Sequence, residues 1–345
     1  MRGVGRLKRW LRNATAPFRS GVVILLYHRA FEASSDPQRL CVHPDRFTEH
    51  LEILRKNCTV LSLKGLCHAL EKRQLPKRGV LIAFDDGYVD NLWNAKPLLE
   101  RYEVPATVFV TTGYIGKEKE FWWDELESLV LLAPSLPKVL QVELNGTVYQ
   151  WGLDRWQVIR EPDSICKNWH VGMKEDPTPR HQAYRELHRL VRPLSHEERE
   201  KALTMLRAQA KNGGQPRPMY RALTPEEVCK LAEGGLVEVG AHTVTHPVLS
   251  GLPVDVQKRE IAESRQTLET LLGQEIVAFA YPYGGRSDLG EMAVRLAQET
   301  GFRLAFANVP GIALLRSDPF WLPRFLVRDW EGETFERRLR AFFTV

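Results

Sequence analysis

Val-Leu-Ile-Ala-Phe-Asp-Asp-Gly-Tyr, residues 80–88, is the stretch on which the fold assignment depends. Its continuous apolar run predicts a strand buried on both faces, as in a parallel sheet, with two carboxylates where the strand ends. Because neighbouring side chains point to opposite faces of a strand, Asp85 and Asp86 are expected to have different tasks. One could bind a cation while the other moves protons. Taken alone, Asp-Asp-Gly is more often an ordinary turn, so the other segments must decide.

The segments around this stretch alternate between strands and helices. Apolar, often β-branched runs predict strands at residues 22–28, 59–61, 106–111, 236–240, 276–281 and 302–307. Helical spacing or capping residues predict helices at residues 44–57, 63–72, 91–102, 225–234, 255–272 and 289–300. This alternation predicts a parallel sheet with right-handed crossovers, in which the active site lies at the C-terminal ends of the strands. His28 and Asp85 lie at such ends.

The alternation is interrupted between residues 117 and 221. Residues 139–151 alternate in polarity around Asn145-Gly146, a strong signal for a β-hairpin, and a long polar, helix-prone region follows. We expect residues 117–221 to form an inserted α+β cap subdomain, residues 1–20 a basic leader, and residues 21–116 and 222–345 the main domain. The cap offers no catalytic constellation, and its histidines are expected at the surface: His170, His181, His188 and His196.

The composition is that of a soluble enzyme. The chain has 345 residues, 43% of them hydrophobic and 26% charged, with a formal net charge of +5. This mild charge, without a long basic run in the body of the chain, does not indicate nucleic-acid binding. The 5 cysteines are scattered and form no C-x-x-C pair, which argues against a disulfide framework and fits a reducing compartment.

Residues 1–19 are basic, and the first acidic residue is Glu32. Their apolar side chains could share one helical face, so we hypothesise that this leader lies on an anionic membrane surface; a disordered basic tail is the alternative. No apolar block of signal-peptide form separates the charges, and no stretch approaches the ~20 apolar residues of a bilayer span. We therefore expect a cytoplasmic protein with peripheral contact to the inner membrane surface through residues 1–19.

His242 and His246 follow the predicted strand at residues 236–240 and are four residues apart. One helical turn would place both imidazoles on one side, and two histidines with one carboxylate are the ligand set of a catalytic zinc. An H-x-x-x-H pattern is weak alone, but here it shares a sheet edge with the two aspartates. We select Asp86, His242 and His246 as ligands, which leaves Asp85 as general base for the attacking water. Zn²⁺ is the expected ion, although Co²⁺, Ni²⁺ or Fe²⁺ suit the same ligands.

Phe-Asp-Asp-Gly at residues 84–87 and His-Thr-x-x-His at residues 242–246 together resemble the motifs of the polysaccharide deacetylase family, the NodB-homology or carbohydrate esterase 4 group. The resemblance covers about residues 21–113 and 222–330. It implies a distorted (β/α) barrel of the NodB type that uses a divalent metal to remove acetyl groups from N-acetylated sugars. It also implies that Asp85 is the base and that Asp86, His242 and His246 hold the metal.

Residues 279–284, Phe-Ala-Tyr-Pro-Tyr-Gly, resemble a third family motif that lines the substrate groove. By this resemblance Pro282 and Tyr283 contact the substrate, and the backbone N–H of Tyr283 helps to stabilise the oxyanion. Sugars stack on flat apolar faces, so Tyr88 and Trp93 are expected at the rim beside Tyr283.

Two departures from the family pattern concern catalytic residues. Many members carry an arginine just before the proline of the third motif, where this chain has Ala280 and Tyr281. The Leu-Pro-Arg at residues 322–324 resembles a C-terminal element of one subgroup, so Arg324 is expected to replace that arginine. No histidine follows His246, and residues 25–29 resemble an N-terminal motif of the poly-N-acetylglucosamine deacetylase subgroup. His28 is therefore the candidate acid for the leaving amine; a hydrogen-bonded structural role is its alternative.

The expected activity is thus metal-dependent hydrolysis of the N-acetyl group of a sugar or polysaccharide. Two other functions stay open at this stage. Two histidines and a carboxylate also describe the ligands of non-haem Fe(II) oxygenases, although those enzymes usually use an antiparallel barrel. The missing motif arginine leaves open an inactive, metal-bearing carbohydrate-binding module.

Overall fold

The computed structural model describes residues 20–158, 168–211 and 213–344. The basic leader at residues 1–19 and Cys166 lie outside the described residues, so the predicted membrane contact stays a prediction. Among the described helices, none combines the length and the apolar character needed to cross a bilayer.

An eight-stranded sheet forms the centre of the main domain, and all its pairings are parallel. The strand order is β11-β10-β9-β6-β5-β1-β12, with β4 beside the start of β5. The strands are β1 (Val22–Tyr27), β4 (Thr59–Val60), β5 (Gly79–Phe84), β6 (Ala106–Val110), β9 (Val237–Ala241), β10 (Ala278–Ala280), β11 (Leu304–Phe306) and β12 (Phe325–Leu326). The longer strands are buried on both faces, as their continuous apolar sequences predict.

The segment before β12 joins the two ends of this sheet. Leu322 donates its N–H to Ala305 in β11, and Ala307 donates to Leu322, both at 2.9 Å. Five residues further on, the N–H of Val327 donates to Leu26 in β1 at 2.9 Å. One short segment thus pairs first with β11 and then with β1, so the sheet curls into a distorted barrel. The expected α/β class and NodB-type (β/α) barrel are confirmed.

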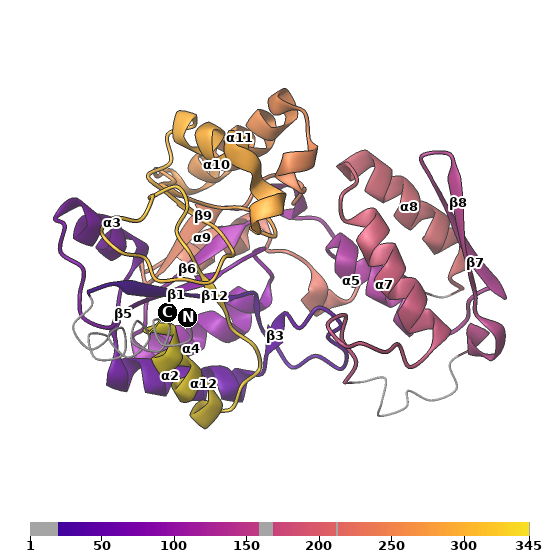
Figure 1. Ribbon diagram of the computed structural model, residues 1–345, viewed down its shortest axis with the longest axis horizontal. Coiled ribbons are helices and arrows are strands. Elements are labelled where there is room, and N and C mark those ends of the chain that lie inside the picture. The colour runs from indigo at the N-terminus through magenta and orange to yellow at the C-terminus, as the bar shows by residue number, and fades with distance from the viewer. Residues whose placement is uncertain (1–19, 159–167, 212, 345) are drawn as a thin grey trace, which may run out of the picture.

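Helices cover the outside of the sheet (Figure 1). They are α2 (Pro44–Asn57), α3 (Leu63–Glu71), α4 (Lys96–Tyr102), α9 (Pro225–Ala232), α10 (Val254–Leu272), α11 (Arg286–Glu299) and α12 (Gly332–Phe342). Thr224 and Glu227 form a capping box at the start of α9. The cap residue of α10 is Pro253, and Asp255 lies in the first turn, where a carboxylate interacts favourably with the helix dipole.

Residues of the insertion form a second lobe beside the barrel, on the right in Figure 1. It contains α5 (Trp122–Glu127), α7 (Pro179–Val191), α8 (His196–Gln209) and the antiparallel hairpin of β7 (Val139–Leu144) and β8 (Thr147–Gly152). The hairpin turns at Asn145 and Gly146, with φ of 50° and 75°, as predicted. The buried side chains of the lobe form a hydrophobic cluster separate from that of the barrel. Two short strands, β2 (Arg29–Ala30) and β3 (Cys41–Val42), form a separate parallel pair.

Candidate active site

Two strands separated by one other strand bring the predicted ligands to one edge of the sheet. Asp85 and Asp86 follow β5, and His242 follows β9, two strands away across β6. Asp86 has φ of 75° and Gly87 has φ of 80°, so the chain turns sharply after the strand. A Cβ at position 87 would also come within 3.0 Å of Val110 on β6, which explains why this position needs glycine. The turn places both carboxylates in the interior of the site.

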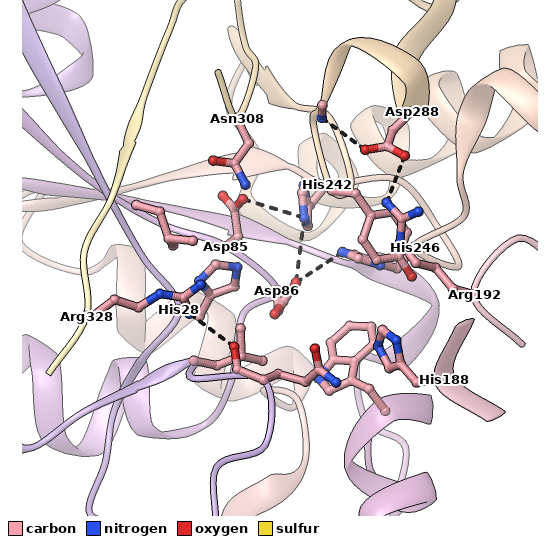
Figure 2. A pocket seen from close by; sticks show the side chains of 16 residues that line it. His28, Asp85, Asp86, His188, Arg192, His242, His246, Asp288, Asn308 and Arg328 are labelled. Carbon is pink, nitrogen blue, oxygen red and sulfur yellow. Dashed lines mark hydrogen bonds and ion pairs between the residues drawn. The ribbon is translucent and has the colours of Figure 1, made fainter. Parts of the chain in front are cut away.

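Asp86, His242 and His246 form a three-residue cluster whose ligand atoms all lie within 4.8 Å of one another. Asp86 Oδ1 is 3.3 Å from His246 Nε2 and 3.6 Å from His242 Nε2 (Figure 2). This carboxylate oxygen is buried and has no hydrogen-bond partner in the described structure, a costly state without a bound cation. His242 Nδ1 lies 2.7 Å from the carbonyl oxygen of Ala280, to which it can donate, leaving the lone pair of Nε2 facing Asp86. These residues fit a divalent metal.

The two histidines are not brought together by a helical turn, as their spacing suggested. Residues 242–246 form a loop in which Thr243 and His246 have φ of 64° and 55°. Glu260 on α10 fixes this loop by accepting the N–H groups of Val244 and Thr245, each at 2.8 Å. A left-handed loop held by side-chain hydrogen bonds therefore replaces the predicted helical turn.

Arg324 pairs with Asp85 in the interior of the barrel. Its Nη1 and Nη2 donate to the two carboxylate oxygens of Asp85 at 2.7 and 2.9 Å, and its Nε donates to the carbonyl of Ala307 at 3.1 Å. Burial alone would raise the pKa of Asp85, but the charge and hydrogen bonds of Arg324, together with His242 and His28, outweigh burial and hold that pKa below its ordinary value. Asp85 is thus ionised and oriented beside the ligand cluster, with Oδ2 3.8 Å from His242 Nε2.

His28 lies at the end of β1 and lines the same cavity. Its Nδ1 is buried and makes no hydrogen bond within the described residues, unlike a histidine that serves only to satisfy neighbouring groups. Burial lowers the pKa of His28, while the nearby Asp86 and Asp85 carboxylates act in the opposite direction. In Figure 2 the ring lies on the Asp85 side of the cavity, next to Arg328.

The cavity above these residues has a volume of about 280 Å³. Tyr283 lines it, with its ring centroid 4.7 Å from that of His246. The inserted lobe contributes three further walls, which are Trp123, His188 and Arg192. Arg192 also donates to Asp288 at the start of α11 with a distance of 2.7 Å, so it ties the lobe to the barrel beside the site.

The expectation that the histidines of the lobe are surface residues is wrong for two of them, His181 and His188. His188 is half-buried between Trp122 and the cavity, and His181 is buried with Nδ1 2.7 Å from the hydroxyl of Thr178. Both lie on the inner face of α7 with Tyr184, at spacings of three and four residues. This helical spacing is the feature of the sequence from which the inward direction of these two side chains could have been predicted.

Three predicted substrate contacts are also corrected. Tyr88 is fully buried, with its hydroxyl donating to Asp124 at 2.6 Å between barrel and lobe, because the chain turns inward after Gly87. Trp93 is 54% exposed and donates its indole N–H to Glu227 at 3.1 Å, outside the cavity. Pro282 is buried and does not line the cavity.

Comparisons with known proteins agree with this geometry. The family model described as polysaccharide deacetylase matches residues 72–131 and 196–305. Poly-β-1,6-N-acetyl-D-glucosamine N-deacetylases from Staphylococcus aureus strains are 34% identical to this chain over 89 residues; this match spans 26% of this chain and only 31% of their length.

Solved structures share the fold at low sequence identity. The Streptococcus pyogenes deacetylase PplD in complex with acetate superposes with a TM-score of 0.57 and 19% identity, covering 93% of this chain and 99% of that one. IcaB from Ammonifex degensii gives a TM-score of 0.56 and 18% identity, covering 94% and 98%.

Proposed function

We propose that this chain is a member of the polysaccharide deacetylase family and hydrolyses the N-acetyl group of an N-acetylated glycan with a divalent metal. The observation that carries the proposal is the pair of neighbouring carboxylates with separate partners. Asp86 presents an unpartnered buried oxygen to two imidazoles, whereas Asp85 is held ionised by Arg324. One carboxylate therefore suits a cation and the other suits proton transfer.

In this proposal, different side chains have different roles in the reaction. Asp86, His242 and His246 would hold the ion, which supplies polarisation of the acetyl carbonyl and a lowered pKa for water. Asp85 accepts the proton of the attacking water, since its ionised form faces the same cluster. His28 gives a proton to the sugar nitrogen as the amide bond breaks, from the Asp85 side of the cavity.

Arg324 is a positioning residue in this scheme. It takes the place of the arginine missing before Pro282, because its guanidinium binds both oxygens of Asp85 from another segment of the chain. The paired base disfavours an inactive binding module. The parallel barrel likewise disfavours a non-haem Fe(II) oxygenase.

We propose zinc as the ion, since two imidazoles and one carboxylate leave an open position in its tetrahedral shell. Polymers of the poly-N-acetylglucosamine type are the first substrates to test, because the similar Staphylococcus aureus proteins are named for that polymer.

Acetate release tests the proposal. The purified chain is incubated with β-1,6-linked N-acetylglucosamine oligomers and with chitopentaose, before and after EDTA treatment and after addition of Zn²⁺, Co²⁺, Ni²⁺ or Fe²⁺. We expect release that EDTA abolishes and one of these ions restores. The Asp85→Asn variant should release acetate at least about 100-fold more slowly, because a general base contributes about 10²–10⁴-fold. Release that survives chelation, or no release with any ion, would contradict the proposal.

A further inference from the structure

In the part of the chain that the structure describes, Arg328 and Arg39 have no carboxylate within ion-pair distance. Arg328 follows β12 and lines the cavity beside His28, whereas Arg39 lies on the loop before β3 and lines a separate pocket with Glu32, Asp36 and Asp329. Within the described residues, no carboxylate oxygen lies within 4.0 Å of either guanidinium. Arg328 Nη1 donates to the backbone carbonyls of Gln38 and Arg39, and its Nε and Nη2 have no partner in the described part of the chain.

The other charged side chains near Arg328 already have partners. Arg192, which also lines the cavity, is paired with Asp288 at 2.7 Å. The carboxylate of Asp36, close to Arg328, accepts the N–H groups of Leu40 and Cys41, each at 2.8 Å. The Nε and Nη2 donors of Arg328 therefore remain available to a ligand.

The two arginines also oppose each other electrostatically. Burial lowers the pKa of Arg328 to about 10; the charge of Arg39 acts in the same direction, and the Asp36 carboxylate acts in the opposite one. Arg328 nevertheless stays protonated at neutral pH, so a partly buried positive charge lies at the cavity wall, and the charge of Arg39 acts on it. An anion bound beside Arg328 would lower the free energy of this arrangement.

We propose that Arg328, with the charge of Arg39 beside it, binds an anionic group of the substrate, either a sugar carboxylate or a phosphate ester. A guanidinium matches both groups by paired N–H donors. Because Arg328 lies next to His28, the candidate acid for the leaving nitrogen, the anionic group belongs to the acetylated sugar or to its neighbour (Figure 2). This inference rests on the proposed function and narrows its substrate class to acidic N-acetylated glycans.

Equilibrium binding tests the inference without any turnover. Calorimetry on the zinc-loaded chain compares a hyaluronan tetrasaccharide, which carries carboxylates, with neutral chitotetraose, and N-acetylglucosamine 1-phosphate with N-acetylglucosamine. We expect at least one anionic probe to bind about tenfold or more tightly than its neutral counterpart, and the probe that does so identifies the anionic group.

Three variants complete the test. Arg328→Gln and Arg39→Gln should each weaken binding of that anionic probe about tenfold and leave the neutral probe unchanged. Arg39 is exposed, so Arg39→Gln carries the test if Arg328→Gln does not fold. Arg316→Gln removes an equal charge near Ala313, which pairs with the start of β1 at the opposite end of the barrel, and should change nothing. Equal binding of anionic and neutral probes, or equal losses in all three variants, would overturn the inference, whereas the proposed function stands or falls with acetate release.

Discussion

Replacing Arg324 should reveal how strongly the buried ion pair with Asp85 supports both the fold and the base. Arg324 is 0% exposed and makes two hydrogen bonds to Asp85, at 2.7 and 2.9 Å. Removing one partner of such a pair leaves a buried charge uncompensated, which costs about 3–5 kcal/mol. We therefore expect Arg324→Met and Asp85→Asn each to lower the free energy of unfolding by about 3–5 kcal/mol.

The double variant distinguishes this pair from two independent residues. With both charged partners removed, no isolated charge remains, so the double variant should lose at least about 2 kcal/mol less than the sum of the single losses. Guanidinium unfolding in EDTA measures all four proteins without a contribution from metal binding. Losses that add within about 0.5 kcal/mol would refute the ion-pair account.

Three further variants test other parts of the structure. Gly113→Ala would place a Cβ 2.5 Å from the carbonyl oxygen of Val244 in the histidine loop, so metal affinity measured by calorimetry should fall, and an unchanged affinity would count against this loop geometry. Burial lowers the pKa of His50 to about 4, so its stabilising contribution is fully present above about pH 6.5 and is lost as the pH falls towards 4. The free energy of unfolding of His50→Gln, measured in urea, should not show this loss of about 3 kcal/mol at low pH. A pH dependence equal to that of the parent chain would contradict this role of His50. Tyr88→Phe leaves Asp124 without its hydrogen-bond donor, so it should lower the free energy of unfolding by about 1–3 kcal/mol while KM stays constant. A raised KM would indicate that Tyr88 contacts the substrate.

The barrel could be predicted from the sequence because its strands are continuous apolar runs separated by helices. Parallel strands buried on both faces require that pattern, and their C-terminal ends meet at one edge of the sheet. The same rule placed Asp86 and His242 at a common edge without any knowledge of the loops.

Local conformation at the site could not be predicted in the same way. The spacing of His242 and His246 fits a helical turn, but tertiary hydrogen bonds from Glu260 hold the chain in a left-handed loop. Positive φ at Thr243 is unusual for a β-branched residue and depends on that tertiary support.

The contribution of the inserted lobe depended on packing between segments far apart in the chain. Arg192 reaches the cavity because the lobe lies against α11 through Asp288. Tyr88 was predicted at the rim because sugars stack on flat apolar faces, but an aromatic side chain after a strand is equally compatible with an interface. Only the position of the lobe, which buries that ring, decides between them.

Metal titration of two neighbouring isosteric variants tests the central claim most directly. Asp85→Asn and Asp86→Asn make the same chemical change one residue apart, so their difference isolates the role of each carboxylate. We predict that zinc binding, measured by calorimetry on the EDTA-treated chain, persists in Asp85→Asn and is lost or weakened at least about 100-fold in Asp86→Asn. Equal zinc affinity in the two variants would contradict the division of tasks on which the whole account depends.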